Sequence, residues 1–106
     1  MKKLFISQPM RGKTPDEIMA IRKKAIDSVR RNYSEEVEVI DSYLREDEYK
    51  VNPLWCLAHS LKLLSTADVA YFAKGWEDAR GCVIEHECAL QYGQDCGIDI
   101  IEDYTD

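Results

Sequence analysis

The chain has 106 residues, with 14 basic and 20 acidic side chains and a formal net charge of −6. This balance argues against non-specific nucleic-acid binding, which depends on neutralising phosphates with Lys and Arg. The sequence contains no apolar run of about eighteen residues and therefore predicts no membrane span. Its length suits one domain over residues 1–106. The segment MKKLFISQPM has too short an apolar stretch for a signal peptide, which favours the cytoplasm.

The first half of the chain predicts a strand, a helix and a second strand. Residues 2–7, KKLFIS, form an apolar run typical of a buried strand. The sequence TPDE at 14–17 predicts a helix start, with Thr as the cap, Pro first and Glu closing a capping box. Apolar residues then follow helical spacing to near Asn32. Residues 37–43, VEVIDSY, alternate in polarity and predict the second strand.

The second half repeats this alternation. The dipeptide Asn-Pro at 52–53 opens a helix with leucines along one face. Residues 68–75, DVAYFAKG, predict a third strand, and residues 80–93 predict a helix that ends at its glycine. Residues 97–104, GIDIIEDY, predict a fourth strand.

Such alternation predicts an α/β fold, namely a small flavodoxin-like or Rossmann-like three-layer sandwich. Its parallel sheet would have four to five strands, right-handed crossovers and helices on both faces. Ligands of such sheets bind outside the carboxyl ends of the strands, near the point where the strand order reverses. The loops expected there are SQPMRG, residues 7–12, and GWEDARG, residues 75–81.

The first loop offers groups that bind anions. Ser7, Gln8, Arg11 and Gly12 supply a hydroxyl, an amide, a guanidinium and a flexible backbone before a helix start, whose free N–H groups favour an anion. Arg11 can make a two-pronged contact with phosphate or carboxylate. The P-loop pattern is absent, and a solvated surface turn remains the alternative.

The second loop leads into a helix that carries a carboxylate between small residues. Gly81, Glu85 and Ala89 share one helix face, which leaves room for a substrate ring beside Glu85. Trp76 in the preceding loop is a candidate for stacking on a planar base. Glu87 lies about 200° round the helix and is expected to face solvent.

FISQPMRGKT and YFAKGWEDARGCVIEHECA resemble the nucleoside 2-deoxyribosyltransferase superfamily. That superfamily includes the 2′-deoxynucleoside 5′-phosphate N-hydrolases and small phage and bacterial proteins of unknown function, and the resemblance spans nearly the whole chain. It implies that Glu85 attacks the anomeric carbon of the sugar and displaces the base, after which water or a second base resolves the intermediate. It also implies a homodimer or higher homo-oligomer and no cofactor.

The resemblance assigns roles to further residues. The first loop matches the loop that binds the sugar phosphate in that superfamily, and Arg11 within it would suit a nucleoside monophosphate. Ala79 stands where many members have Asp or Ser, and the neighbouring Asp78 is a candidate either for the proton donor to the leaving base or for a helix cap. Asp68, at the start of the third strand, is either structural or part of the pocket.

A partly buried Glu85 would have a raised pKa, which nearby donors must offset. Arg80 or a hydroxyl of Tyr71 or Tyr43 is expected to supply them. The predicted catalytic residues are Glu85 and Asp78, and the predicted substrate-binding residues are Ser7, Gln8, Arg11, Gly12, Asp68, Trp76, Arg80 and Gly81.

Other reactive side chains predict less. The four cysteines include no CxxC pair, and Cys82 with His86 supplies only two ligands, so free thiols and no metal site are expected. His59 lies among leucines and is expected to be a packed or surface residue. Two alternatives to the enzyme stay open: a nucleotide-binding or sensing protein without turnover, and a flavodoxin-like module for another ligand. Flavin is disfavoured because the first loop lacks a Ser/Thr-rich phosphate cradle.

Overall fold

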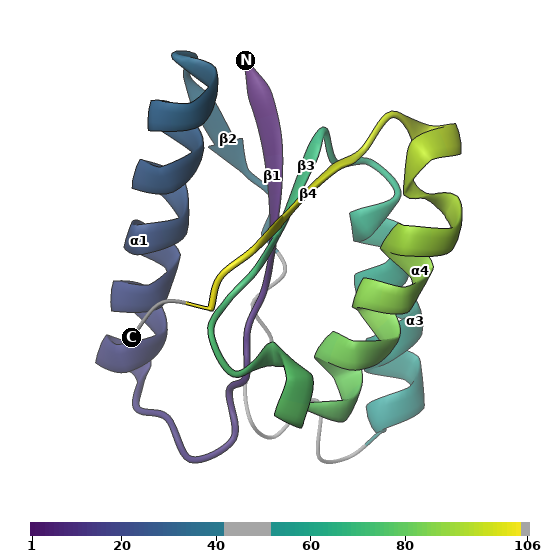
Figure 1. Cartoon of the computed structure of the whole chain (residues 1–106). Coiled ribbons are helices and arrows are strands. Elements are labelled where there is room, and N and C mark those ends of the chain that lie inside the picture. Colours follow the sequence, from purple (N-terminus) through teal and green to yellow (C-terminus); the bar gives the residue numbers. More distant parts are fainter. Residues whose placement is uncertain (42–51, 105–106) are drawn as a thin grey trace.

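The computed structural model describes residues 1–41 and 52–104 and has the predicted α/β fold (Figure 1). In this part of the chain no helix is long and apolar enough to cross a membrane. The elements in chain order are β1 (Lys2–Ser7), α1 (Pro15–Tyr33), β2 (Val37–Val39), α3 (Pro53–Leu64), β3 (Val69–Phe72), the 3₁₀ turn η1 (Trp76–Asp78), α4 (Arg80–Cys96) and β4 (Asp99–Glu102).

The four strands form one parallel sheet in the order β2-β1-β3-β4. Helix α1 covers one face of the sheet, and α3 and α4 cover the other (Figure 1). From β1 the chain moves outward to β2 and then crosses to β3 on the other side of β1. The strand order therefore reverses between β1 and β3, where Ser7 pairs with Phe72 at the carboxyl ends. A ligand site is expected at this point.

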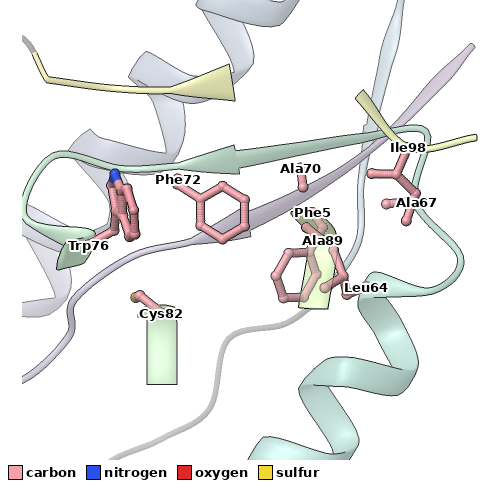
Figure 2. Packing of buried hydrophobic residues seen from close by; sticks show 9 residues of the cluster. All are labelled: Phe5, Leu64, Ala67, Ala70, Phe72, Trp76, Cys82, Ala89 and Ile98. Atoms are coloured by element: carbon pink, nitrogen blue, oxygen red, sulfur yellow. The ribbon is translucent and has the colours of Figure 1, made fainter. Parts of the chain in front are cut away.

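Alternating side chains of the central strands build two separate core layers. Leu4 and Ile6 of β1 pack with residues of α1, whereas Phe5 packs on the side of α3 and α4. Figure 2 shows Phe5, Phe72 and Ala89 of α4 in this second layer. Ser7 follows Phe5 by two residues and therefore points to the same face of the sheet, toward α4.

The predicted start of α1 is confirmed, whereas the predicted end of α4 is wrong. Thr14 and Glu17 form the reciprocal capping box at the start of α1. Helix α4 continues past Gly93 to Cys96, and Gly97 ends it in the left-handed region at φ +72°. Gly93 is buried inside the helix, where an added Cβ would lie 3.6 Å from Ile98. A Cβ at that distance would make an ordinary van der Waals contact, so Gly93 is a regular helical residue and Gly97 is the residue that ends the helix.

The strands are shorter than their sequence patterns. The strand predicted at 37–43 is observed as Val37–Val39, and residues 42 and 43 lie outside the described residues. The strand predicted at 68–75 ends at Phe72, because the chain turns at Gly75, whose φ is +89°. The strand predicted at 97–104 is confined to Asp99–Glu102.

Candidate functional site

Glu85 and Ser7 meet at the carboxyl end of β1. Glu85 lies on the buried stripe of α4 and is 8% exposed, although it carries a carboxylate. The hydroxyl of Ser7, itself 2% exposed, donates a hydrogen bond to Glu85 Oε1 at 2.6 Å. The bond joins residues 78 positions apart in sequence. The end of β1 and helix α4 therefore converge where the strand order reverses.

Burial sets the electrostatics of this carboxyl group. Loss of hydration raises the pKa of Glu85 to about 7, and hydrogen bonds from Ser7 and Ser60 offset part of that rise. Glu85 is therefore divided between its acid and carboxylate forms near neutral pH. The neighbouring thiol of Cys82 is different, because burial raises its pKa to about 12 and keeps it protonated and unreactive.

The donors to Glu85 are not those predicted. Arg80 is exposed at the start of α4, and Tyr71 donates to Asp103 at 2.5 Å on the face covered by α1. Tyr43 lies outside the described residues. The second donor, Ser60, was missed by sequence reasoning. The feature that could have revealed Ser60 is its position in the helix: it shares the buried face of α3 with Cys56 and Leu64 although it carries a hydroxyl.

A small cavity opens beside the carboxylate. Its volume is about 50 Å³, enough for one functional group of a ligand. Its lining residues are Phe5, Ile6, Ser7, Gln8, Met10, Arg22, Ser60 and Glu85. Of the residues predicted to bind substrate, Ser7 and Gln8 line it. Arg22 was missed because it lies inside α1 rather than in a loop, and only the packing of α1 brings it to the cavity.

Four other residues predicted to bind or act on the substrate lie in or next to the two loops but do not line the cavity. Arg11 and Gly12 lie in the exposed turn before α1, and Gly12 has φ +78°. Asp78 is exposed in η1 and does not cap α4, because the N-cap is Ala79, which has no side-chain hydrogen bond. Gly81 lies in the first turn of α4, and an added Cβ would meet nothing within 4 Å. Glu87 is exposed as predicted.

Trp76 is a core residue rather than an open stacking platform. Its ring stacks on His86 with centroids 4.0 Å apart, and Phe72 packs at a tilt against it. The side chain is 8% exposed, and Figure 2 shows it at the end of the apolar layer. His86 in turn contacts Glu102 at 2.5 Å. One face of the indole is therefore occupied by the protein's own imidazole.

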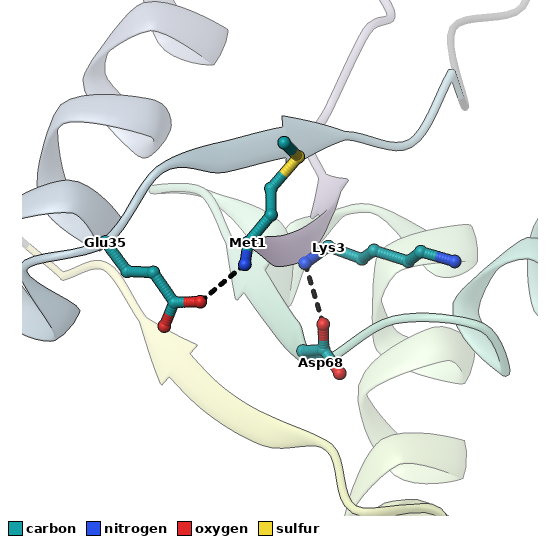
Figure 3. Close-up of polar contacts among 4 residues, drawn as sticks. All are labelled: Met1, Lys3, Glu35 and Asp68. Carbon is teal, nitrogen blue, oxygen red and sulfur yellow. Dashed lines mark hydrogen bonds and ion pairs between the residues drawn. The ribbon is translucent and has the colours of Figure 1, made fainter.

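Asp68 is structural and lies at the wrong end of the sheet for a substrate-binding residue. Its carboxylate accepts a hydrogen bond from the Lys3 backbone N–H at 2.8 Å (Figure 3). Nearby, the Met1 amino group pairs with Glu35 at 2.6 Å. These contacts are at the amino ends of the strands, whereas Ser7 and Glu85 are at the carboxyl ends. The expectation that Asp68 lines the pocket is therefore wrong.

The remaining titratable candidates lie away from the cavity. His59 stacks on Trp55 at 5.3 Å on α3 and does not line the cavity. Within residues 1–41 and 52–104, no three His, Cys, Asp or Glu side chains gather closely enough to hold a metal ion. None of the four cysteines, all of which lie in the described residues, forms a disulfide.

No protein-family model, curated protein or solved structure matches the chain. The resemblance to the nucleoside 2-deoxyribosyltransferase superfamily therefore stays a prediction.

Proposed function

We propose that the protein cleaves the N-glycosidic bond of a nucleoside monophosphate or a related nucleotide, with Glu85 as the nucleophile. The observation that supports this most directly is the Ser7–Glu85 pair. A buried carboxylate, oriented by a 2.6 Å hydrogen bond, lines a cavity at the reversal point of a parallel sheet. A buried acid costs folding free energy, and such perturbed groups concentrate at functional sites.

The proposed reaction has two steps. The ionised carboxylate of Glu85 attacks the anomeric carbon while the C–N bond breaks, and the base leaves with the bonding electron pair and takes up a proton. Water then attacks the same carbon, releases Glu85 and delivers its own proton to solvent. Two inversions retain the configuration, as in glycosidases that use a carboxylate nucleophile. A nucleoside base in place of water would make the reaction a transfer.

The ionisation of Glu85 controls the first step. Because its pKa is raised to about 7, only part of the free protein carries the nucleophile at neutral pH. Ser7 keeps that fraction higher than burial alone would allow. We propose Asp78 as the acid that protonates the leaving base, since it follows β3 on the loop that leads into α4.

A nucleotide-binding protein without turnover is the second candidate. The observation in its favour is Ala79, which has no side-chain hydrogen bond at the N-cap of α4 and supplies no acid there. Such a protein would keep the cavity and bind a nucleotide without breaking its C–N bond.

The test is a screen of the purified protein against nucleotides and nucleosides, with free base separated by chromatography. Glu85→Ala is compared with Glu87→Ala, an exposed position on the same helix. We expect base release from at least one nucleotide, lost in Glu85→Ala and kept in Glu87→Ala. Nucleotide-induced thermal stabilisation without base release would favour the binding protein, and release that survives Glu85→Ala would exclude the proposed mechanism.

We also propose a cytoplasmic homodimer or higher oligomer. The support is the exposure of large apolar side chains on α3 and α4, among them Trp55 at 59% and Tyr92 at 67%. Light scattering of the purified chain measures its mass, and a monomer at micromolar concentration would refute this part.

A further inference from the structure

Arg22 is a cation placed inside the candidate site by the packing of α1. It lies in the second turn of the helix, one turn after the buried Ile18, and its half-buried side chain lines the cavity that also holds Glu85. Within the described ranges its guanidinium has no hydrogen bond and no ion pair, and Asp41, which is exposed, is the acid that interacts with it through space. A guanidinium has five donors and favours a ligand that occupies two of them.

Gln8 adds an unpaired acceptor to the same cavity. The side chain is 8% exposed, and its Nε2 donates to the Ile18 carbonyl oxygen at 3.3 Å. A carbonyl oxygen only accepts hydrogen bonds, so this contact fixes the orientation of the amide. Gln8 Oε1 is then buried without a partner among the residues that the structure describes. Buried acceptors are nearly always satisfied, so Oε1 indicates a missing donor.

The unpaired groups of the cavity are therefore complementary to one kind of molecule. Arg22 can bind an anion, Gln8 Oε1 lacks a hydroxyl or amine donor, and Glu85 lies beside them on α4. A cavity of about 50 Å³ accommodates the group that meets these side chains while the rest of the molecule extends outward.

We propose that Arg22 and Gln8 recognise the sugar of the substrate and the anionic group attached to it. Arg22 binds the anionic group, and Gln8 Oε1 accepts a hydrogen bond from a sugar hydroxyl. This assignment rests on the proposed function for the presence of a sugar, and it places the anion contact on α1 rather than on the loop after β1. Arg11, the cation expected from the sequence, is exposed and does not line the cavity. The anion is a phosphate monoester or a carboxylate, since a guanidinium pairs with either.

The test is calorimetric binding of ribose 5-phosphate and of ribonate, which offer the two anions on related sugar frames. We expect the wild-type protein to bind at least one of them, and the tighter ligand identifies the anion. Arg22→Met should weaken that binding by about tenfold or more, and Arg22→Lys by less, because the charge remains. Gln8→Met should weaken it by about fivefold.

Two further variants separate Arg22 from its surroundings. Arg11→Met removes an exposed cation and should change the affinity by less than about threefold. Asp41→Asn removes the acid that competes for Arg22 and should tighten binding. Thermal melts confirm that each variant folds, and Arg22→Lys keeps the test valid if Arg22→Met does not.

The proposal is overturned if the wild-type protein binds neither probe at millimolar concentration. It is also overturned if Arg22→Met binds as well as wild type, or if Arg11→Met causes the larger loss. These outcomes are independent of turnover. Probe binding that depends on Arg22, with no base released from any nucleotide, would refute the proposed hydrolysis and keep the recognition site. Base release that requires Glu85 but not Arg22 would support the proposed hydrolysis and refute the recognition site.

Discussion

Replacing Glu85 by Gln is expected to stabilise the protein above neutral pH. Folding raises the pKa of this carboxyl group from its ordinary value of 4.5 to about 7, chiefly through burial. The folded state therefore holds a proton that the unfolded state releases between these two values. The stability contributed by the protonated group is complete below pH 4.5 and is lost as the pH rises through 7.

The size of this loss follows from the two pKa values. The rise from 4.5 to about 7 corresponds to about 3 kcal/mol of unfolding free energy lost between acid and mildly alkaline pH. Gln has nearly the same shape as Glu, accepts the hydrogen bond from Ser7 and carries no charge. At pH 8 Glu85→Gln should therefore gain about 3 kcal/mol, or on the order of 10–20 °C in melting temperature for a domain of this size. At pH 4 it should match wild type.

Urea denaturation of wild type and Glu85→Gln from pH 4 to pH 8 measures this directly. Glu87→Gln is the matched control, because Glu87 is exposed on the same helix, and its stability should stay within about 0.5 kcal/mol of wild type at each pH. Equal stability of Glu85→Gln and wild type at pH 8 would refute the reasoning. It would mean that the carboxylate ionises without cost, and hence that it is solvated or paired in the folded protein.

Three further outcomes are expected. Ser7→Ala removes the 2.6 Å hydrogen bond to Glu85, so the pKa of Glu85 should rise above 7 and the pH midpoint of the stability loss should move upward; an unchanged midpoint would contradict the role of Ser7. Base release, if Glu85 is the nucleophile, should increase as the pH rises through about 7, and a rate that falls over this range would make Glu85 an acid instead. Asp68→Ala removes the acceptor for Lys3 and should cost about 1 kcal/mol in urea denaturation while leaving nucleotide binding unchanged; weakened binding would return Asp68 to the site.

The fold could be predicted from the sequence because the features that define its helices and strands depend on residues close together in the chain. The capping box of Thr14 and Glu17 lies within one helical turn, and the apolar periods of the strands and helices are equally local. The end of α4 was predicted wrongly because two glycines stand four residues apart. Gly97 adopts the left-handed conformation and ends the helix, and the Ile98 N–H then donates to the Gly93 carbonyl oxygen at 2.8 Å.

The candidate site was predicted in part for the same reason. Ser7 was predicted from its place at the end of a strand, and Glu85 from its place between small residues on one helix face and from the family resemblance. Arg22 and Ser60 lie inside helices, and only the packing of those helices on the sheet directs their side chains to the cavity. The prediction that Asp68 lines the pocket failed because Asp68 comes just before its strand begins. In a parallel sheet that position lies at the edge opposite the site.

The strand order also determines when the site can form during folding. Strand β1 is central and pairs with β3, so a backbone hydrogen bond such as that from the Asp68 N–H to the Lys3 carbonyl oxygen joins residues 65 positions apart. Pairings of such long range close large loops and form slowly. On the ribosome, β1 and α1 must wait until β3 has been synthesised, and the Ser7–Glu85 contact requires α4 as well. The candidate site is thus assembled after β1 and β3 are in place, and it should be among the first parts to be lost when the contact between α4 and the sheet loosens.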